Sequence, residues 1–248
     1  DTLRTLARST GVMLADGLAE RLREVQLLAE SGRALDDRGW REVLETLQRT
    51  RTHVTWVGLS AASGEVVSAT SGLLVGHSVE SRPWFQAALG GPHVGDVHTA
   101  KLLSQLLPPT ETGEPLRFID FAAPLRDVQQ QPSGVLGVHV SWDWAQSVIN
   151  SLRSPLAREQ GVLVFILDRT GEVIHRPTGV RTSARPFALP DPAEAPAVLT
   201  WEDGQRYLTA TAPVVARHPS SDLGWTVVTR QSIDQVHAGV REAQRAAL

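Results

Sequence analysis

Arg82, Trp84 and Phe85 stand close together in the segment Ser81-Arg82-Pro83-Trp84-Phe85. The guanidinium group of an arginine can hold a carboxylate through two parallel hydrogen bonds, and aromatic rings offer flat walls to a small ligand. A simpler interpretation also fits, in which Trp84, Phe85 and Leu89 form the buried face of a short helix and Arg82 is solvated. Taken alone, the segment favours the simpler interpretation. The elements around it must show whether it forms a ligand site.

The composition narrows the possible functions. The chain has 248 residues, of which 42% are hydrophobic and 21% are charged, as is ordinary for a globular protein with one large or two small domains. The net charge of −3 gives no support to a nucleic-acid partner. The absence of cysteine excludes disulfides, thiolate metal sites and cysteine nucleophiles. These features are compatible with the cytosol and with the periplasm.

The first stretch has the clearest periodicity. Apolar residues recur at three- and four-residue steps from Leu3 to Leu28, which predicts a helix over about 1–31. Such a helix is about 45 Å long, so it either spans two stacked domains or pairs with another helix. Leu3, Leu6 and Met13 form an exposed stripe in this prediction and would be a dimer seam, with packing on the sheets expected from Leu14 onward. No apolar run reaches the roughly 18 residues of a membrane span, and no signal peptide is present. The sequence begins abruptly, inside the predicted helix, which predicts that it is a piece of a longer protein.

Short strands and turns predict an α+β fold with two similar antiparallel-sheet domains, because closely spaced strands pair antiparallel. A helix capped by Asp36 follows the first helix. The predicted elements are strands 53–60 and 65–70, a short helix around Trp84, strands 94–98, 117–124 and 135–142, a helix over 142–152, strands 161–168, 172–175, 205–214 and 224–230, and a closing helix over 232–248.

Four segments together resemble a known family. They are Ser81–Phe85, the strand from Phe118 that ends in Ala-Pro-Leu-Arg-Asp, the run Gly134–Trp142, and Leu167–Pro177. In this order the chain resembles the double Cache extracytoplasmic sensor domains of bacterial chemoreceptors, histidine kinases and diguanylate cyclases. The resemblance implies a stalk helix over 1–35, a membrane-distal PAS-like ligand-binding domain over 36–147, a membrane-proximal PAS-like domain over 148–231, and a closing helix over 232–248 that leads to a membrane span.

The resemblance also implies a ligand site in the distal domain. In amino-acid-binding members an Arg and a Trp hold the ligand carboxylate, three Tyr line the site, and an Asp holds the ammonium group. Arg82 and Trp84 match this pattern, whereas the expected Tyr positions carry His77, Phe85 and His98, and the expected Asp position carries His139. Trp56 is expected in the core or in the pocket wall.

The replacement at His139 changes the expected ligand. A histidine is neutral or positive near pH 7 and is a poor partner for an amine. The sequence therefore predicts a small carboxylate, with an amino acid or an amine as the alternative. Asp120 stands between Ile119 and Phe121. It could point inward and pair with Arg82 or with a polar group of the ligand, because a buried acid needs a partner. The sequence slightly favours the alternative, in which Asp120 lies on the solvated face of its strand.

Other functions are weighed against the sensor. Three histidines can bind a transition metal, but they lack a His-x-x-x-His pair and have Arg82 nearby, so no metal and no cofactor is expected. No hydrolase, kinase or metalloprotease motif occurs, so no catalytic residue is assigned. A periplasmic hydrolase and a partner-protein interaction module remain alternatives, whereas hairpins argue against a periplasmic solute-binding protein. The sequence thus predicts a periplasmic, homodimeric sensor domain whose membrane spans and output domain lie outside this chain.

Overall fold

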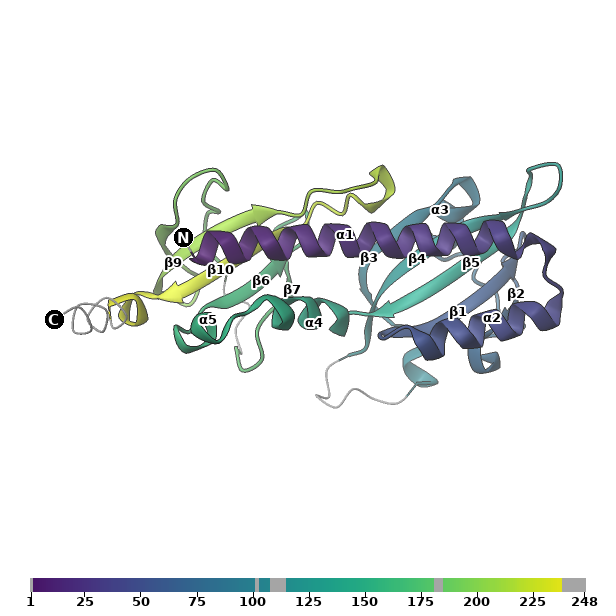
Figure 1. Cartoon of the computed structure of the whole chain (residues 1–248), viewed down its shortest axis with the longest axis horizontal. Helices are drawn as coiled ribbons and strands as arrows, with labels where there is room; N and C mark the ends of the chain where they lie inside the picture. Colours follow the sequence, from purple (N-terminus) through teal and green to yellow (C-terminus); the bar gives the residue numbers. More distant parts are fainter. Residues whose placement is uncertain (1, 101–102, 108–114, 181–184, 238–248) are drawn as a thin grey trace. The chain divides into compact units, whose positions relative to one another are not determined.

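The computed structural model describes residues 2–100, 103–107, 115–180 and 185–237 (Figure 1). The chain divides into two compact units, each built on one five-stranded antiparallel sheet. The first-sheet unit comprises Gly17–Trp144 and His218–Ser221, and the second-sheet unit comprises Asp1–Asp16, Ala145–Arg217 and Asp222–Leu248. The predicted α+β class with two antiparallel sheets is confirmed. Within the described ranges, no helix combines the length and the apolar character that a membrane crossing requires.

Two helices open the chain. Helix α1 covers Thr2–Ser31, close to its predicted limits, and contributes to both units. Helix α2 covers Asp37–Thr50 after a short 3-10 turn, Gly32–Ala34. The Asp36 side chain accepts a hydrogen bond from the Gly39 backbone N–H at 2.8 Å. The predicted N-cap is therefore present, and it satisfies one of the free donors at the start of α2.

The predicted exposed stripe on α1 is wrong for two of its three residues. Leu3 and Leu6 are buried in the second-sheet unit, and the hydroxyl of Thr229 donates a hydrogen bond to the Leu3 carbonyl at 2.9 Å. Only Met13 of the three is exposed, at 42%. Packing of α1 on a sheet thus begins at Leu3 and not at Leu14, because the first turn of the helix is also buried against the apolar residues of the second-sheet unit.

The first sheet has the order β2-β1-β5-β4-β3. Its strands are β1 (Val54–Ala61), β2 (Val66–Ala69), β3 (His93–Thr99), β4 (Arg117–Arg126) and β5 (Pro132–Ser141), with helix α3 (Pro83–Gly90) between β2 and β3 and 3-10 turns at Thr70–Gly72 and Leu103–Gln105. Strands β4 and β5 are longer than predicted, so the gap between the predicted strands 117–124 and 135–142 shrinks to a tight turn. Much of the gap between the predicted strands 94–98 and 117–124 lies outside the described residues.

The two faces of the first sheet have different neighbours. On one face the Trp84 ring of α3 lies directly above Gly137 of β5. On the other face Phe121, Val138 and Val140 line a cavity together with residues of α1 and α2. Because successive residues of a strand point to opposite faces, Phe118, Asp120 and His139 must point to the α3 side.

The second sheet repeats the plan with the order β7-β6-β10-β9-β8. Its strands are β6 (Leu163–Leu167), β7 (Val173–His175), β8 (Ala197–Thr200), β9 (Arg206–Pro213) and β10 (Thr226–Ser232), and helices α4 (Asp143–Leu152) and α5 (Pro155–Glu159) precede them. Strand β8 and helix α5 were not predicted. Residues 233–237 are helical, and the rest of the predicted closing helix lies outside the described residues.

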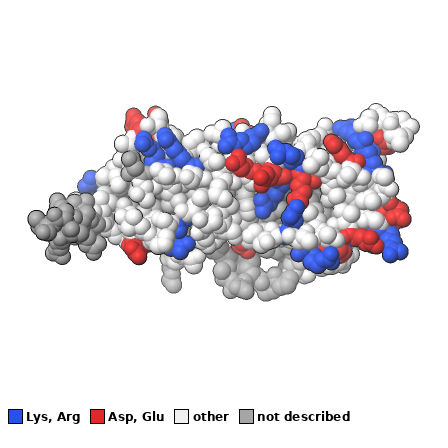
Figure 2. All heavy atoms as spheres, in the orientation of Figure 1, with Lys and Arg blue, Asp and Glu red and all other residues white. Residues whose placement is uncertain are grey.

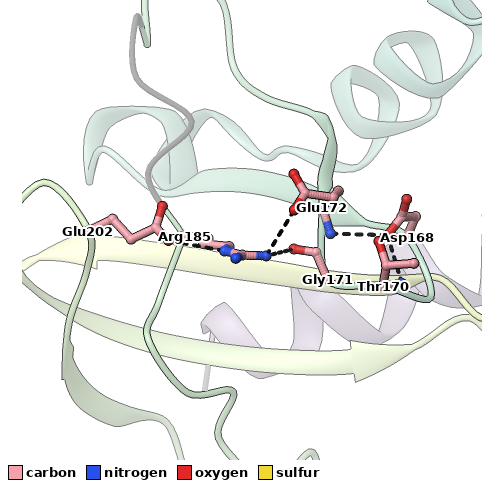
Figure 3. Close-up of polar contacts among 6 residues, drawn as sticks. All are labelled: Asp168, Thr170, Gly171, Glu172, Arg185 and Glu202. Atoms are coloured by element: carbon pink, nitrogen blue, oxygen red, sulfur yellow. Dashed lines mark hydrogen bonds and ion pairs between the residues drawn. The ribbon is translucent and has the colours of Figure 1, made fainter.

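A side-chain turn closes the β6–β7 hairpin (Figure 3). Oδ1 of Asp168 accepts hydrogen bonds from the Thr170 backbone N–H at 2.8 Å and from the Glu172 backbone N–H at 3.0 Å. Burial alone would raise the pKa of Asp168, but these donors outweigh it and lower that pKa. This turn lies in Leu167–Pro177, one of the four segments on which the family resemblance rests.

Candidate functional site

A buried carboxylate lies between two imidazole rings on the α3 side of the first sheet. Asp120 of β4 faces His139 of β5 directly across the strand pair. Nε2 of His98, on β3, lies 2.7 Å from Oδ2 of Asp120, and Nδ1 of His139 lies 2.6 Å from Oδ1. The Asp120 and His139 side chains are 6% and 8% exposed, whereas that of His98 is 44% exposed. His98 therefore separates the buried pair from solvent.

Aromatic rings enclose His139. Its ring stacks on Trp56 with centroids 4.8 Å apart and on Phe118 with centroids 5.4 Å apart. The Trp84 ring meets it edge-on at 5.6 Å. This enclosure fixes the imidazole and removes water from around it, so its contact with Asp120 is made in a medium of low dielectric constant.

The contact between Asp120 and His139 is short but poorly directed. Oδ1 of Asp120 and Nδ1 of His139 are both buried, and neither has a hydrogen bond of acceptable geometry with any described residue. The bond from His98 to Oδ2 of Asp120, by contrast, is well formed. We therefore interpret the His139 contact as electrostatic and the His98 contact as a hydrogen bond.

The two imidazoles determine the charge state of Asp120. Burial would raise the pKa of this carboxyl, but the electrostatic contact with His139 and the hydrogen bond from His98 outweigh burial and hold the pKa far below its usual range. The hydrogen bond to Asp120 in turn raises the pKa of His98, against the opposing effects of its partial burial and of the nearby Arg82 charge. Asp120 is therefore ionised near neutral pH, and His98 is protonated more readily than an ordinary histidine.

Arg82 immediately precedes the helix that carries Trp84 of this cluster. It occupies the N-cap position of α3 and is half-buried. Its side chain forms no hydrogen bond or ion pair with any residue in the described part of the chain. Its positive charge opposes the rise in the pKa of His98. Arg82 is half-buried and His98 is exposed, so solvent reaches both side chains.

Two glycines make room for the cluster. A Cβ atom at Gly137 would stand 2.8 Å from the Trp84 ring, and one at Gly95 would stand 3.2 Å from Cβ of Asp120. Both distances are shorter than ordinary carbon contacts. Close approach of Trp84 and Asp120 to the sheet therefore depends on these positions lacking a side chain.

Most of the residues singled out in the sequence meet at this cluster. Trp56, Trp84, Phe118, Asp120 and His98 each contact His139 or Asp120, and Phe85 is buried and packs edge-on against Trp84 with centroids 6.1 Å apart. His77 is exposed.

Two expectations on strand orientation are now decided. The favoured placement of Asp120 on a solvated face is wrong, because its side chain points into the protein on the α3 side. His139 faces the same side. Phe118 is a member that sequence reasoning missed. Its position two residues before Asp120 on one strand was the available signal, since i and i+2 share a face.

The cluster is not arranged as a metal site. Among the described residues, no three His, Asp or Glu side chains are placed to hold a metal ion together. His98 and His139 approach different oxygens of one carboxylate, and each ring is committed to that contact.

A cavity of about 580 Å³ lies on the opposite face of the first sheet. Its floor is apolar, with Phe121, Val138 and Val140, and its rim is charged. Arg51 and Glu24 form an ion pair across that rim at 2.6 Å. Figure 2 shows acidic and basic side chains adjoining one another on the face drawn there, without a separate basic patch on that face.

Comparison with known proteins places the fold. No known sequence family matches the chain, and no curated protein matches it. Solved structures do match. The ligand-binding domain of the Pseudomonas aeruginosa amino-acid chemoreceptor PctB in complex with L-Arg is 20% identical, with a TM-score of 0.64 over 92% of this chain and 93% of that chain.

Two further structures have the same architecture. The ligand-binding domain of the Pseudomonas aeruginosa amino-acid chemoreceptor PctC in complex with GABA is 18% identical, with a TM-score of 0.60 over 90% of this chain and 95% of that one. The sensory domain of a Campylobacter jejuni chemoreceptor with isoleucine bound is 14% identical, with a TM-score of 0.65 over 95% and 93%. The chain therefore has the double Cache fold of chemoreceptor ligand-binding domains.

Proposed function

We propose that this chain is the extracytoplasmic sensor domain of a bacterial transmembrane receptor and that it binds a small carboxylate at Arg82. The observation that carries the proposal is the Arg82 guanidinium, which has no partner among the residues that the structure describes and which precedes α3, the helix that carries Trp84 of the aromatic cluster. The fold, shared with ligand-binding domains of chemoreceptors, supports a binding role over catalysis. Fold alone does not fix function, so the argument depends on the site.

The charges around the cluster favour an anionic ligand. Asp120 is covered by His98 and His139, so its negative charge is not presented to solvent. Both nitrogens of His98 are already engaged, Nε2 with Asp120 and Nδ1 with the Thr99 carbonyl, so Arg82 is the group that would donate hydrogen bonds to a ligand. Its guanidinium alone matches the two oxygens of a carboxylate. The Trp84 ring, on the same helix as Arg82, offers the apolar surface for the rest of a small solute.

A specific observation keeps an amine-bearing ligand as the second candidate. Asp120 lies beside His139, so the cluster does contain the acid that an ammonium group needs, although on β4 and not at the position expected from the family pattern. An ammonium group reaches this acid only after the His98 ring moves away from it. An amino acid would then use Arg82 and Asp120 together.

Signalling would follow the resemblance stated above. In this proposal residues 36–147 form the membrane-distal domain, residues 148–231 form the membrane-proximal domain, and the terminal helices connect to membrane spans. The receptor acts as a homodimer, and its output domain is a kinase, a cyclase or a methyl-accepting domain. Ligand must bind one of two conformations more tightly to shift their populations.

The test is a thermal-shift and calorimetry screen with acetate, succinate, matching amino acids and matching amines. A ligand at 100 times its dissociation constant stabilises the folded state by about 2.7 kcal/mol, which a melting curve detects. Arg82→Ala should weaken carboxylate binding at least tenfold, because a hydrogen bond to a charged group contributes about 1.5–3 kcal/mol. Arg41→Ala, at an exposed position of α2, is the matched control.

Three outcomes separate the alternatives. Carboxylate binding that Arg82→Ala abolishes and Arg41→Ala leaves intact supports the proposal. Amino acids that bind more than tenfold tighter than the carboxylates lacking their amino group favour the second candidate. Binding that does not depend on Arg82, or turnover of any solute in the screen, would contradict a carboxylate sensor.

A further inference from the structure

Arg230 is a buried arginine on the central strand of the second sheet. β10 lies between β6 and β9, just as β5 lies between β1 and β4 in the first sheet. Arg230 faces Thr209 of β9, and His139 on β5 faces Asp120 of β4. Each sheet therefore carries an ionisable side chain at its centre, but the one in the second sheet is a permanent cation.

Three aromatic rings surround the Arg230 guanidinium. Its central carbon lies 3.9 Å from the ring centroid of Tyr207, 4.4 Å from that of Trp201 and 4.9 Å from that of Phe165. All three distances are within the range of cation–π attraction. Trp201 is itself fixed, because its Nε1–H donates to the Thr209 hydroxyl at 3.0 Å. The cage therefore holds the guanidinium in one place.

The charge of Arg230 is only partly compensated. Nη1 lies 3.4 Å from Oδ2 of Asp203, a long contact, and the Tyr207 hydroxyl donates to the same oxygen at 2.9 Å. Nε is buried and has no hydrogen-bond partner among the residues that the structure describes. A buried cation is costly unless an anion and hydrogen bonds satisfy it. An anion placed along the edge formed by Nε and Nη2 would supply this compensation.

Asp203 is held in its position and does not approach that edge. It lies in the turn between β8 and β9, where its Oδ1 accepts from the Gln205 backbone N–H at 3.0 Å. Arg185 holds the neighbouring residue, since its Nε donates to Glu202 at 3.1 Å and its Nη1 donates to the Gly171 carbonyl at 2.7 Å (Figure 3). The turn is therefore tied to the β6–β7 hairpin, which leaves Asp203 at the Nη1 end of the guanidinium.

We infer that Arg230 forms a second ligand site, which takes a small carboxylate. The two oxygens of a carboxylate match Nε and Nη2 in a bidentate arrangement, and the rings of Trp201 and Phe165 provide a wall for a methyl or ethyl group. The Arg230 side chain is 6% exposed, which favours a ligand of the size of acetate or propionate. This site lies in the other unit and does not depend on the proposal made for Arg82.

The experiment uses the whole chain with Arg82→Ala, so that the first site is removed. Calorimetric titration with sodium acetate and sodium propionate, at constant ionic strength, should give saturable binding to one site. Adding Arg230→Met should weaken that binding at least tenfold. Asp203→Asn should strengthen it several-fold, because the amide keeps the bond from Gln205 but no longer competes for the guanidinium with a full charge. Sodium sulfate serves as the anion control.

Circular dichroism establishes that each variant is folded. If Arg230→Met does not fold, Arg230→Lys replaces it, since a lysine keeps the charge but lacks the planar fork, and it too should weaken acetate binding at least tenfold. The inference is overturned if the Arg82→Ala chain shows no saturable carboxylate binding, if the Arg230 variant binds as well as its parent, if sulfate binds as tightly as acetate, or if Asp203→Asn weakens binding.

Discussion

Asp120 and His139 face each other across β4 and β5, and their side chains bring Oδ1 and Nδ1 to 2.6 Å. His98 reaches the other oxygen of the same carboxylate from β3. Three adjacent strands thus contribute one member each to a buried charge cluster. The stability and the pH response of the first-sheet unit should therefore depend on this cluster.

The first prediction concerns Asp120→Asn. The substitution removes the negative charge but keeps the shape, so both imidazoles lose the partner that compensates their burial. We expect the free energy of unfolding at pH 7 to fall by about 1–3 kcal/mol, the usual cost of a lost charged hydrogen bond in a protein interior. Urea unfolding monitored by fluorescence measures it. Asp234→Asn, at an exposed position, should change stability by less than about 0.5 kcal/mol, and an equal loss there would refute the assignment.

The second prediction concerns pH. The hydrogen bond to Asp120 raises the pKa of His98 in the folded state above the unfolded value of about 6.5. Its stabilisation is therefore complete below about pH 6.5 and disappears as the pH rises through the folded-state pKa. The pKa of Asp120 is lowered, so its contribution is present above about pH 3.9 and disappears as the pH falls toward the folded-state pKa. These groups together favour the folded state most between about pH 4 and 6.5.

Urea titrations from pH 4 to 9 test this profile. His98→Gln should make the loss of stability above pH 6.5 shallower, whereas His77→Gln, at an exposed position outside the cluster, should leave the slope unchanged. The interpretation fails if both variants keep the parent's slope.

The third prediction concerns Gly137→Ala. The added methyl group would meet the Trp84 ring at 2.8 Å, and the ring cannot move far because it packs against His139 and Phe85. We expect a loss of about 1–3 kcal/mol in the free energy of unfolding, as for other overpacked cores. Gly90→Ala, where nothing lies within 4 Å of the new atom, is the matched control. Equal melting temperatures for the two variants would show that Trp84 is not held as described.

The fourth prediction concerns the face of α1. Leu6 is buried in the second-sheet unit, so Leu6→Ala should destabilise by about 2–4 kcal/mol. Met13 is exposed at 42%, so Met13→Ala should change the free energy of unfolding by less than about 0.5 kcal/mol. Thermal unfolding of both variants at two protein concentrations measures this. If Leu6→Ala instead dissociates a dimer and leaves the monomer's stability unchanged, the helix has the dimer seam that the sequence predicted.

The sequence predicted those elements whose signals are local. The Asp36 cap, the hairpin of the two strands predicted over 53–60 and 65–70, and the short helix around Trp84 each depend on a few adjacent residues. The orientation of Asp120 was not predictable in this way. Strand β4 is buried on both faces, so an alternating pattern that would separate inside from outside is absent.

Contacts between residues far apart in the sequence were not predictable either, because they too lack a local signal. The contact between His98 and Asp120 depends on an irregularity in the β3–β4 register between Gly95 and His98, and no local sequence signal specifies it. Strand β8 is four residues long and lies at a sheet edge after a proline-rich stretch, so it lacks the length from which periodicity is recognised. The aromatic surroundings of Arg230 could not be predicted, because its aromatic neighbours are 23 to 65 residues away in the chain.

The discontinuity of the second-sheet unit has a consequence for the order of folding. That unit combines Asp1–Asp16 with strands that begin only at Leu163, and the bond from Thr229 to Leu3 joins residues 226 positions apart. Contacts this distant in sequence form late, because the intervening chain must be ordered first. The first-sheet unit is almost continuous from Gly17 to Trp144. During synthesis the first-sheet unit should therefore fold first. The amino-terminal turns of α1 can pack only later, when β10 has emerged from the ribosome.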